Sequence, residues 1–162
     1  MKLVISDVKN LPQISDDKFT VIYNDGNLHH CIGCFGCWIK TPGQCVIKDE
    51  YSNMGQLLSR CDELILISKC TYGGFSPFVK NVLDRAISYI SPYFVIRNGE
   101  MHHERRYDNV ISISALFYGE DITQSEKETA KSLVAANAVN YDGKVKNVLF
   151  FNSAEEAKAV LI

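Results

Sequence analysis

The chain has 162 residues, of which 46% are hydrophobic and 22% charged, and its formal net charge is -2 at pH 7. The near-neutral charge, with no basic run interleaved with aromatic residues, argues against nucleic-acid binding. No apolar stretch is long enough to span a membrane, and the first seven residues lack the apolar core of a signal peptide. We therefore expect a cytoplasmic protein, folded as one domain over residues 1–162.

Five apolar runs of strand length follow one another along the chain and predict a sheet. They cover residues 3–5, 19–23, 64–67, 110–116 and 145–151. Apolar residues at helical spacing lie between or after these runs, at residues 51–60, 77–89, 123–139 and 153–161. Strands that alternate with helices predict a parallel sheet with right-handed crossovers and helices on both faces.

The link between the first two strands departs from this pattern. Only residues 7–18 are available for it, and Pro12 is among them. A parallel crossover needs about 10–12 residues including its helix. A full helix is therefore not expected between these two strands.

Ligands of open parallel sheets bind beyond the carboxyl ends of the strands, near the point where the strand order reverses. Three predicted loops lie there, at residues 7–15, 69–76 and 117–121. The second is the most informative, because two adjacent glycines free the backbone to approach a ligand and two aromatic residues flank them. A tight strand-to-helix turn with two packing aromatics explains the same pattern equally well. The candidate binding residues are Lys69, Cys70, Thr71, Tyr72, Gly73, Gly74, Phe75 and Ser76, together with Phe117, Tyr118 and Gly119.

Three separated motifs resemble those of NAD(P)H-dependent flavin reductases and of the iron–sulfur flavoproteins grouped with them. The motifs are the run from Gly73 to Pro77 with Lys80 and residues 83–85, the cysteine segment at residues 31–50, and the block at residues 99–107. The resemblance implies a flavodoxin-like, three-layer α/β sandwich with a five-stranded parallel sheet in the order 2-1-3-4-5. It also implies FMN as cofactor, NAD(P)H as co-substrate and electron transfer to a quinone, a free flavin or a cluster.

Proteins of this group work as homodimers or homotetramers with the flavin near a subunit boundary. By resemblance, we expect a homo-oligomer here, in which a neighbouring chain could complete the site. The aromatic residues Tyr89, Tyr93 and Phe94 are the surface expected to make that contact. The expected partners are thus a second copy of the chain and a small-molecule electron acceptor.

The chain departs from this family after its first strand. Family members carry a loop rich in glycine, serine and threonine that holds the FMN phosphate at a helix N-terminus, and most of that first helix has no counterpart here. The second loop departs too, with Lys69 and Thr71 where relatives have proline and then an aromatic residue. Lys9 or Lys69 would have to replace the lost phosphate donors as point charges. An alternative function is a flavodoxin-like protein that has lost FMN and serves as a binding or assembly partner.

Four of the six cysteines form a compact cluster with the spacing Cys-x2-Cys-x2-Cys-x7-Cys. Four thiolates that converge in one loop are what an iron–sulfur cluster requires, and the iron–sulfur flavoproteins carry a compact motif that this spacing fits. Zinc and free or redox-active thiols are the alternatives. The candidate ligands of a 4Fe-4S cluster are Cys31, Cys34, Cys37 and Cys45, whereas Cys61 and Cys70 have the pattern of small core residues.

The remaining polar and aromatic motifs favour structural roles. Asp84 and Arg85 are interpreted as a structural salt bridge, Lys80 as a surface lysine and Trp38 as a packing residue. The histidine pairs at residues 29–30 and 102–103 lack a third ligand at a defined spacing. We therefore expect both pairs to lie in exposed loops.

Overall fold

The computed structural model describes residues 1–11 and 19–161. Its centre is a five-stranded sheet in the order β2-β1-β3-β6-β7, in which every neighbouring pair is parallel. Counted within the sheet alone, this is the predicted order 2-1-3-4-5. The strands are β1 (Lys2–Ser6), β2 (Phe19–Tyr23), β3 (Glu63–Lys69), β6 (Ser112–Tyr118) and β7 (Lys144–Phe151).

Helices cover both faces of this sheet, as the alternation of elements predicts. They are α1 (Gly36–Ile39), α2 (Met54–Ser59), α3 (Pro77–Arg85), α4 (Gln124–Asn140) and α5 (Ala154–Ala159). The helix predicted at residues 77–89 is shorter than expected, because its last part is the separate 3-10 turn η1 (Ile87–Tyr89). The four-residue α1 was not predicted from the sequence.

The two faces of the sheet are covered unequally. Leu3 and Ile5 of β1 point to the face packed by α2, α3 and α4, whereas Val4 points to the face that packs Ala157 of α5. Strands that are buried on both faces carry continuous apolar runs rather than alternating ones. This is why residues 64–67 are apolar without interruption.

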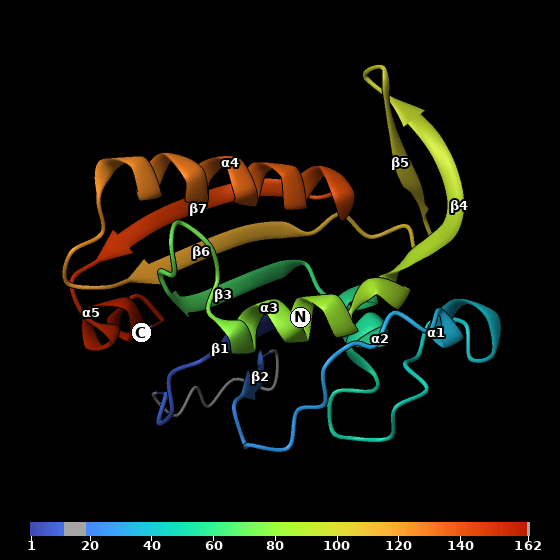
Figure 1. Ribbon diagram of the computed structural model, residues 1–162, viewed down its shortest axis with the longest axis horizontal. Coiled ribbons are helices and arrows are strands. Elements are labelled where there is room, and N and C mark those ends of the chain that lie inside the picture. Colours follow the sequence, from blue (N-terminus) through green and yellow to red (C-terminus); the bar gives the residue numbers. More distant parts are fainter. Residues whose placement is uncertain (12–18, 162) are drawn as a thin grey trace.

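A two-stranded antiparallel hairpin, formed by β4 (Ile90–Arg97) and β5 (Glu100–Arg105), lies outside the sheet and projects away from it (Figure 1). The patterns along the sequence did not predict this hairpin. Its turn is Asn98-Gly99, with φ angles of 52° and 82°. Asn-Gly is the preferred pair for a two-residue hairpin turn, so a local signal for the hairpin was present.

The predicted aromatic contact surface is only partly exposed. Tyr93 and Phe94 of β4 are 70% and 65% exposed, but Tyr89 is 2% exposed and belongs to the core. Its hydroxyl donates to the side-chain oxygen of Asn109 at 3.2 Å. Tyr89 is therefore a core residue, and the prediction that placed it on the surface is wrong. No helix within residues 1–11 and 19–161 is long and apolar enough to cross a membrane.

Candidate functional site

The carboxyl ends of the parallel strands meet at one edge of the sheet, where the connection from β3 to α3 forms a tight turn (Figure 1). Thr71 and Gly74 close this turn through two backbone hydrogen bonds of 3.0 and 2.8 Å. Gly73 has a φ of 75° and lies so close to α4 that a Cβ atom would be 2.7 Å from the Cβ of Thr129. A glycine is therefore required at position 73, both by backbone conformation and by space.

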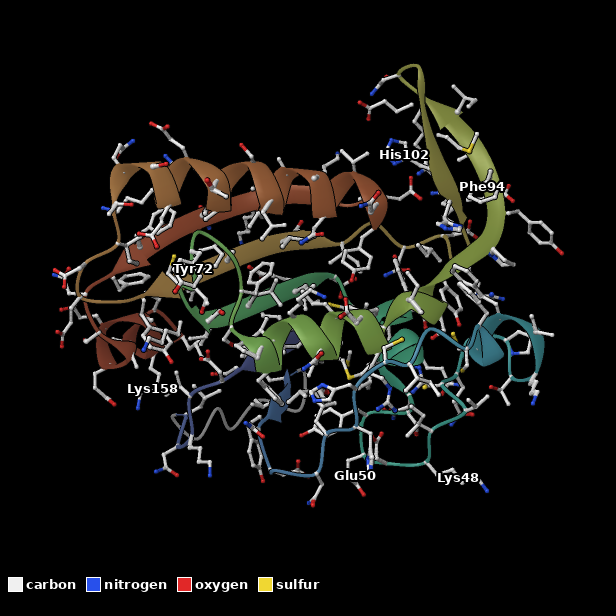
Figure 2. All side chains as sticks on the ribbon, in the orientation of Figure 1. Lys48, Glu50, Tyr72, Phe94, His102 and Lys158 are labelled. Atoms are coloured by element: carbon white, nitrogen blue, oxygen red, sulfur yellow. The ribbon has the colours of Figure 1, made fainter. Side chains whose placement is uncertain are left out.

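Tyr72 stands at the tip of this turn (Figure 2). Its side chain is 91% exposed, and its φ of 52° places it in the left-handed region. Residues other than glycine, asparagine and aspartate rarely adopt this conformation, which costs about 1–2 kcal/mol. The turn thus holds a large aromatic ring in solvent, in a backbone conformation that an aromatic residue disfavours.

The other aromatic residues of the predicted site lie in the core instead. Phe75 is 8% exposed and Phe117 is fully buried. Their rings stack with centroids 5.1 Å apart, and Phe117 also stacks on Phe150 at 5.7 Å. Ser76 is buried and caps α3, because its hydroxyl accepts from the backbone N–H of Val79. These buried side chains pack beneath the turn. Tyr72 is the residue of the turn whose side chain is exposed.

The end of β1 is joined to β3 and β6 by a single carboxylate. Asp7 accepts from the backbone N–H of Lys69 at 2.8 Å and from the hydroxyl of Tyr118 at 3.0 Å. The carbonyl of Tyr118 in turn accepts from the N–H of Cys70 at 2.9 Å. Burial, and then the proximity of Asp7, raise the pKa of Tyr118 well above its usual range, so this hydroxyl stays protonated and donates. The predicted loop at residues 7–15 is described only as far as Leu11.

FMN, the cofactor that the family resemblance implies, can be tested against this edge. The turn offers the exposed ring of Tyr72 and the half-buried backbone of Gly74, which suit the flat isoalloxazine end. In sheets of this order the flavin lies at the switch point between β1 and β3, and Asp7 occupies that point. Its carboxylate already accepts hydrogen bonds from the Lys69 N–H and the Tyr118 hydroxyl. A phosphate at this point would need these two donors. The ring end fits, whereas the phosphate end does not.

The four clustered cysteines form a second candidate site. All four line one cavity of about 300 Å³, together with Phe35, Asp84, Arg85 and neighbouring residues. Cys31 and Cys34 are exposed, Cys45 is half-buried and Cys37 is buried. Burial raises the pKa of the Cys37 thiol, and the other three cysteines add to this effect. The predicted set is thus brought together around one space.

No group of three or more histidine, cysteine or acidic side chains in the described part of the chain is placed to hold a single metal ion. The six cysteines are all free thiols. Cys61 is fully buried, as predicted for a core residue, and burial raises its pKa to about 11. Cys70 is only half-buried, beside the glycine turn.

Arg85, in the last turn of α3, fixes the cysteine loop in place. It makes two hydrogen bonds of 2.7 Å to the carboxylate of Asp49 and donates to the carbonyl of His29, also at 2.7 Å. Burial raises the pKa of Asp49, but the hydrogen bonds from Arg85 and from backbone N–H groups outweigh it and lower that pKa to about 2. The predicted Asp84–Arg85 bridge is wrong, since Asp84 pairs with Lys80.

The remaining predictions have mixed outcomes. Trp38 is a packing residue, as predicted, with its indole N–H donating to the carbonyl of Ile90 at 3.0 Å. His29 and His30 are exposed, as expected. His102 and His103, however, lie half-buried on β5, where His103 packs against Trp38 with ring centroids 4.9 Å apart. The prediction of an exposed loop pair is therefore wrong for these two histidines.

The two candidate sites lie at opposite ends of α3. The glycine turn ends at its N-cap residue, and Arg85 in its last turn lines the cysteine cavity. A helix of 9 residues with a rise of about 1.5 Å per residue is about 12 Å long. Within one chain, the two sites are therefore separate.

The strand order and the position of the glycine turn place the chain in the flavodoxin-like class of α/β folds. No protein-family model matches the chain, and no curated protein sequence matches it. Among solved structures it is similar to general stress protein 14 of Treponema denticola in complex with FMN, with 14% identity, coverage of 99% of this chain and 90% of that chain, and a TM-score of 0.52.

Two further structures are similar to a comparable degree. The Trp repressor binding protein of Bacillus subtilis shows 11% identity, coverage of 98% and 95% of the two chains, and a TM-score of 0.54. Azoreductase AzrA shows 12% identity, coverage of 98% and 93%, and a TM-score of 0.54. At these identities the comparisons establish the shared fold.

Proposed function

We propose that the chain is a flavodoxin-like oxidoreductase that binds the isoalloxazine ring of a flavin at the turn formed by residues 71–74. NAD(P)H is the proposed electron donor, and a quinone, a free flavin or a similar small molecule is the proposed acceptor. The fold supports this proposal, because one of the similar structures was solved in complex with FMN. A flavin bound at this turn would supply two-electron chemistry, which no side chain of the site provides by itself.

The exposed and strained Tyr72 is the observation that carries the proposal. A large aromatic ring that is 91% exposed gains nothing from burial, and its left-handed backbone costs stability. Residues in such conformations cluster at ligand-binding sites. A flat ring stacked on Tyr72 would gain from both contact area and aromatic geometry. Gly73 packs the turn against α4 and so fixes the position of the neighbouring Tyr72 ring.

Lumiflavin tests this proposal directly, because it has the flavin ring but neither the ribityl chain nor the phosphate. We expect it to bind the native chain, and the affinity to fall about tenfold, or about 1.4 kcal/mol, in Tyr72→Gly. The same substitution relieves the left-handed backbone, so the free energy of unfolding should rise by about 1 kcal/mol. Fluorescence titration and urea unfolding measure the two effects.

Ile39→Ala is the control, since Ile39 is also a large exposed side chain but lies on α1, in the cysteine loop and not at the glycine turn. It should leave lumiflavin binding unchanged. If Tyr72→Gly bound lumiflavin as well as the native chain does, Tyr72 would have no part in binding. A native chain that fails to bind lumiflavin would rule the proposed function out and favour the alternative of a flavin-free binding partner.

A second candidate function is favoured by the cysteine cavity. Four thiols line a cavity of about 300 Å³ beside the buried Arg85, an arrangement that suits a thiol-based redox centre. An iron–sulfur cluster on the same cysteines would require the loop to rearrange, because the described residues form no group placed to hold a metal ion. Protein purified without oxygen should then be brown and contain iron, and Cys34→Ser should lower the iron content. Cys70→Ser, outside the cavity, is the control. Iron-free protein in which the clustered thiols form no disulfides on mild oxidation would exclude this function.

A further inference from the structure

We infer that the candidate site selects a flavin without a phosphate group, of which riboflavin is the natural form, and discriminates against FMN. This inference rests on the proposed function, because it assumes that the ring binds at the glycine turn. It goes beyond that function by naming which flavin the chain accepts. The feature behind it is the carboxylate of Asp7 at the end of β1.

The position of Asp7 is fixed by three separate hydrogen bonds. Its backbone N–H donates to the carbonyl of Ile67 at 3.2 Å, and its two carboxylate oxygens accept from Lys69 and Tyr118 at 2.8 and 3.0 Å. These bonds connect it to β3 and β6, the two strands whose loops form the candidate site. A phosphate at the end of β1 would have to displace this carboxylate or lie against it.

The carboxylates described around this edge disfavour a phosphate. Asp7 stands at its centre, and Glu120 and Asp121 follow β6 in the loop that lines an adjacent cavity of about 200 Å³. Lys9 and Lys69 belong to the same segments, and Lys127 lines the same cavity, so positive charges are present as well. The Asp7 carboxylate is held by the backbone N–H of Lys69 and by the Tyr118 hydroxyl, not by any of these ammonium groups. A phosphate monoester carries a charge of about -1.5 to -2 at pH 7. Like charges held close together disfavour each other, so binding of FMN would be penalised.

A terminal hydroxyl suits the same carboxylate well. An ionised carboxylate offers about four acceptor positions, and Asp7 uses two of them for Lys69 and Tyr118. Riboflavin ends in a hydroxyl group, which donates a hydrogen bond, whereas FMN ends in a phosphate, which carries only acceptor oxygens when fully ionised. Hydrogen bonds to charged acceptors are about twice as strong as neutral ones. Asp7 therefore distinguishes the two flavins by both charge and hydrogen-bond polarity.

Fluorescence titration of the full chain with riboflavin and with FMN tests the inference. We expect riboflavin to bind about tenfold more tightly than FMN, which corresponds to about 1.4 kcal/mol. Asp7→Asn keeps the size and the acceptor for the Lys69 N–H but removes the charge, so the preference should fall to about threefold or less. Asp108→Asn removes an equal charge at a fully exposed site next to the hairpin and should leave the preference unchanged.

Salt provides an independent measurement on the native chain. Raising the ionic strength from about 0.01 M to about 1 M shortens the Debye length from about 30 to about 3 Å. The affinity for FMN should rise and that for riboflavin should stay constant, because only FMN is repelled. Circular dichroism checks whether Asp7→Asn and Asp108→Asn are folded, and Asp7→Ser provides a second uncharged variant if Asp7→Asn is not.

The outcomes separate this inference from the proposed function. If FMN binds as tightly as riboflavin or more tightly, the inference is overturned and the proposed function stands. If the preference persists in Asp7→Asn and Asp7→Ser, Asp7 is not its cause and the inference fails. If lumiflavin, riboflavin and FMN all fail to bind, the proposed function and the inference fail together.

Discussion

At the scale of single residues, the buried pair of Arg85 and Asp49 connects distant parts of the chain. The Arg85 side chain is fully buried and the Asp49 side chain is 5% exposed. Removing one partner of such a pair leaves an uncompensated charge, at a cost of about 3–5 kcal/mol. The pair therefore holds the cysteine loop against α3, whatever that loop binds.

Asp49→Asn tests this role. It should lower the free energy of unfolding at pH 7 by about 3 kcal/mol or more, measured by urea unfolding. Asp84→Asn, on α3 next to Arg85, is the control, because the exposed Lys80–Asp84 pair contributes only about 0.3–0.5 kcal/mol. If Asp49→Asn and Asp84→Asn lowered the free energy of unfolding equally, the buried pair would have no special role in stability.

The effect should also depend on pH, with a sign fixed by the pKa of Asp49. That pKa falls from an ordinary value of 3.8 to about 2 in the folded protein. A lowered carboxyl pKa stabilises the fold above the unfolded pKa, and this stabilisation disappears as the pH falls through the folded pKa. The difference in stability between the native chain and Asp49→Asn should therefore narrow between about pH 4 and about pH 2.

The partner of Arg85 could not be predicted from the sequence. Arg85 was assigned to its neighbour Asp84, because residues adjacent in sequence are the natural first choice. Its partner lies 36 positions earlier in the chain. Only the fold brings the two together, and no local spacing predicts such a pair. The bonds from Asp7 to Lys69 and Tyr118 likewise cross from strand to strand, so no local pattern predicts them.

At the scale of elements, local signals decided which predictions succeeded. The spacing of Thr123 and Glu126 is that of a capping box, and the structure contains one at the start of α4: Thr123 accepts from the N–H of Glu126, whose carboxylate accepts from the N–H of Thr123. The hairpin of β4 and β5 was missed because its strands mix polar and apolar residues and only Asn98-Gly99 marks the turn. The short η1 after Arg85 could not be separated from α3 by periodicity alone.

Thr123→Ala measures how much this cap contributes. It removes one of the two reciprocal hydrogen bonds, and loss of such a cap typically costs about 1 kcal/mol. Ser132→Ala, at an exposed position in the interior of the same helix, should be neutral or slightly stabilising because alanine is the better helix former. Thermal unfolding of both variants checks the contrast, and an equally stable Thr123→Ala would show that α4 is held by packing alone.

At the scale of the whole molecule, the sheet could be predicted almost completely. Continuous apolar runs such as residues 64–67, and the helices between the strands, are direct consequences of a parallel sheet covered on both faces. The candidate site could be predicted only as a set of loops. Phe117 was expected in a loop but lies in β6 and points into the core, whereas Tyr72 points into solvent. This difference depends on tertiary packing, which no pattern along the chain encodes.

The unequal cover of the two sheet faces has a consequence for how the molecule opens. On one side, α3 and α4 bury eight residues between them, whereas α5 buries only Ala157 on the other. When α5 leaves the sheet, little more than the Ala157 methyl group and the residues around it becomes exposed. The free energy of this local opening is therefore far below that of global unfolding. Backbone amides of residues 154–159 should therefore exchange with deuterated solvent long before those of β3, and Val4, Ile67 and Leu116 would be the first core side chains to meet water.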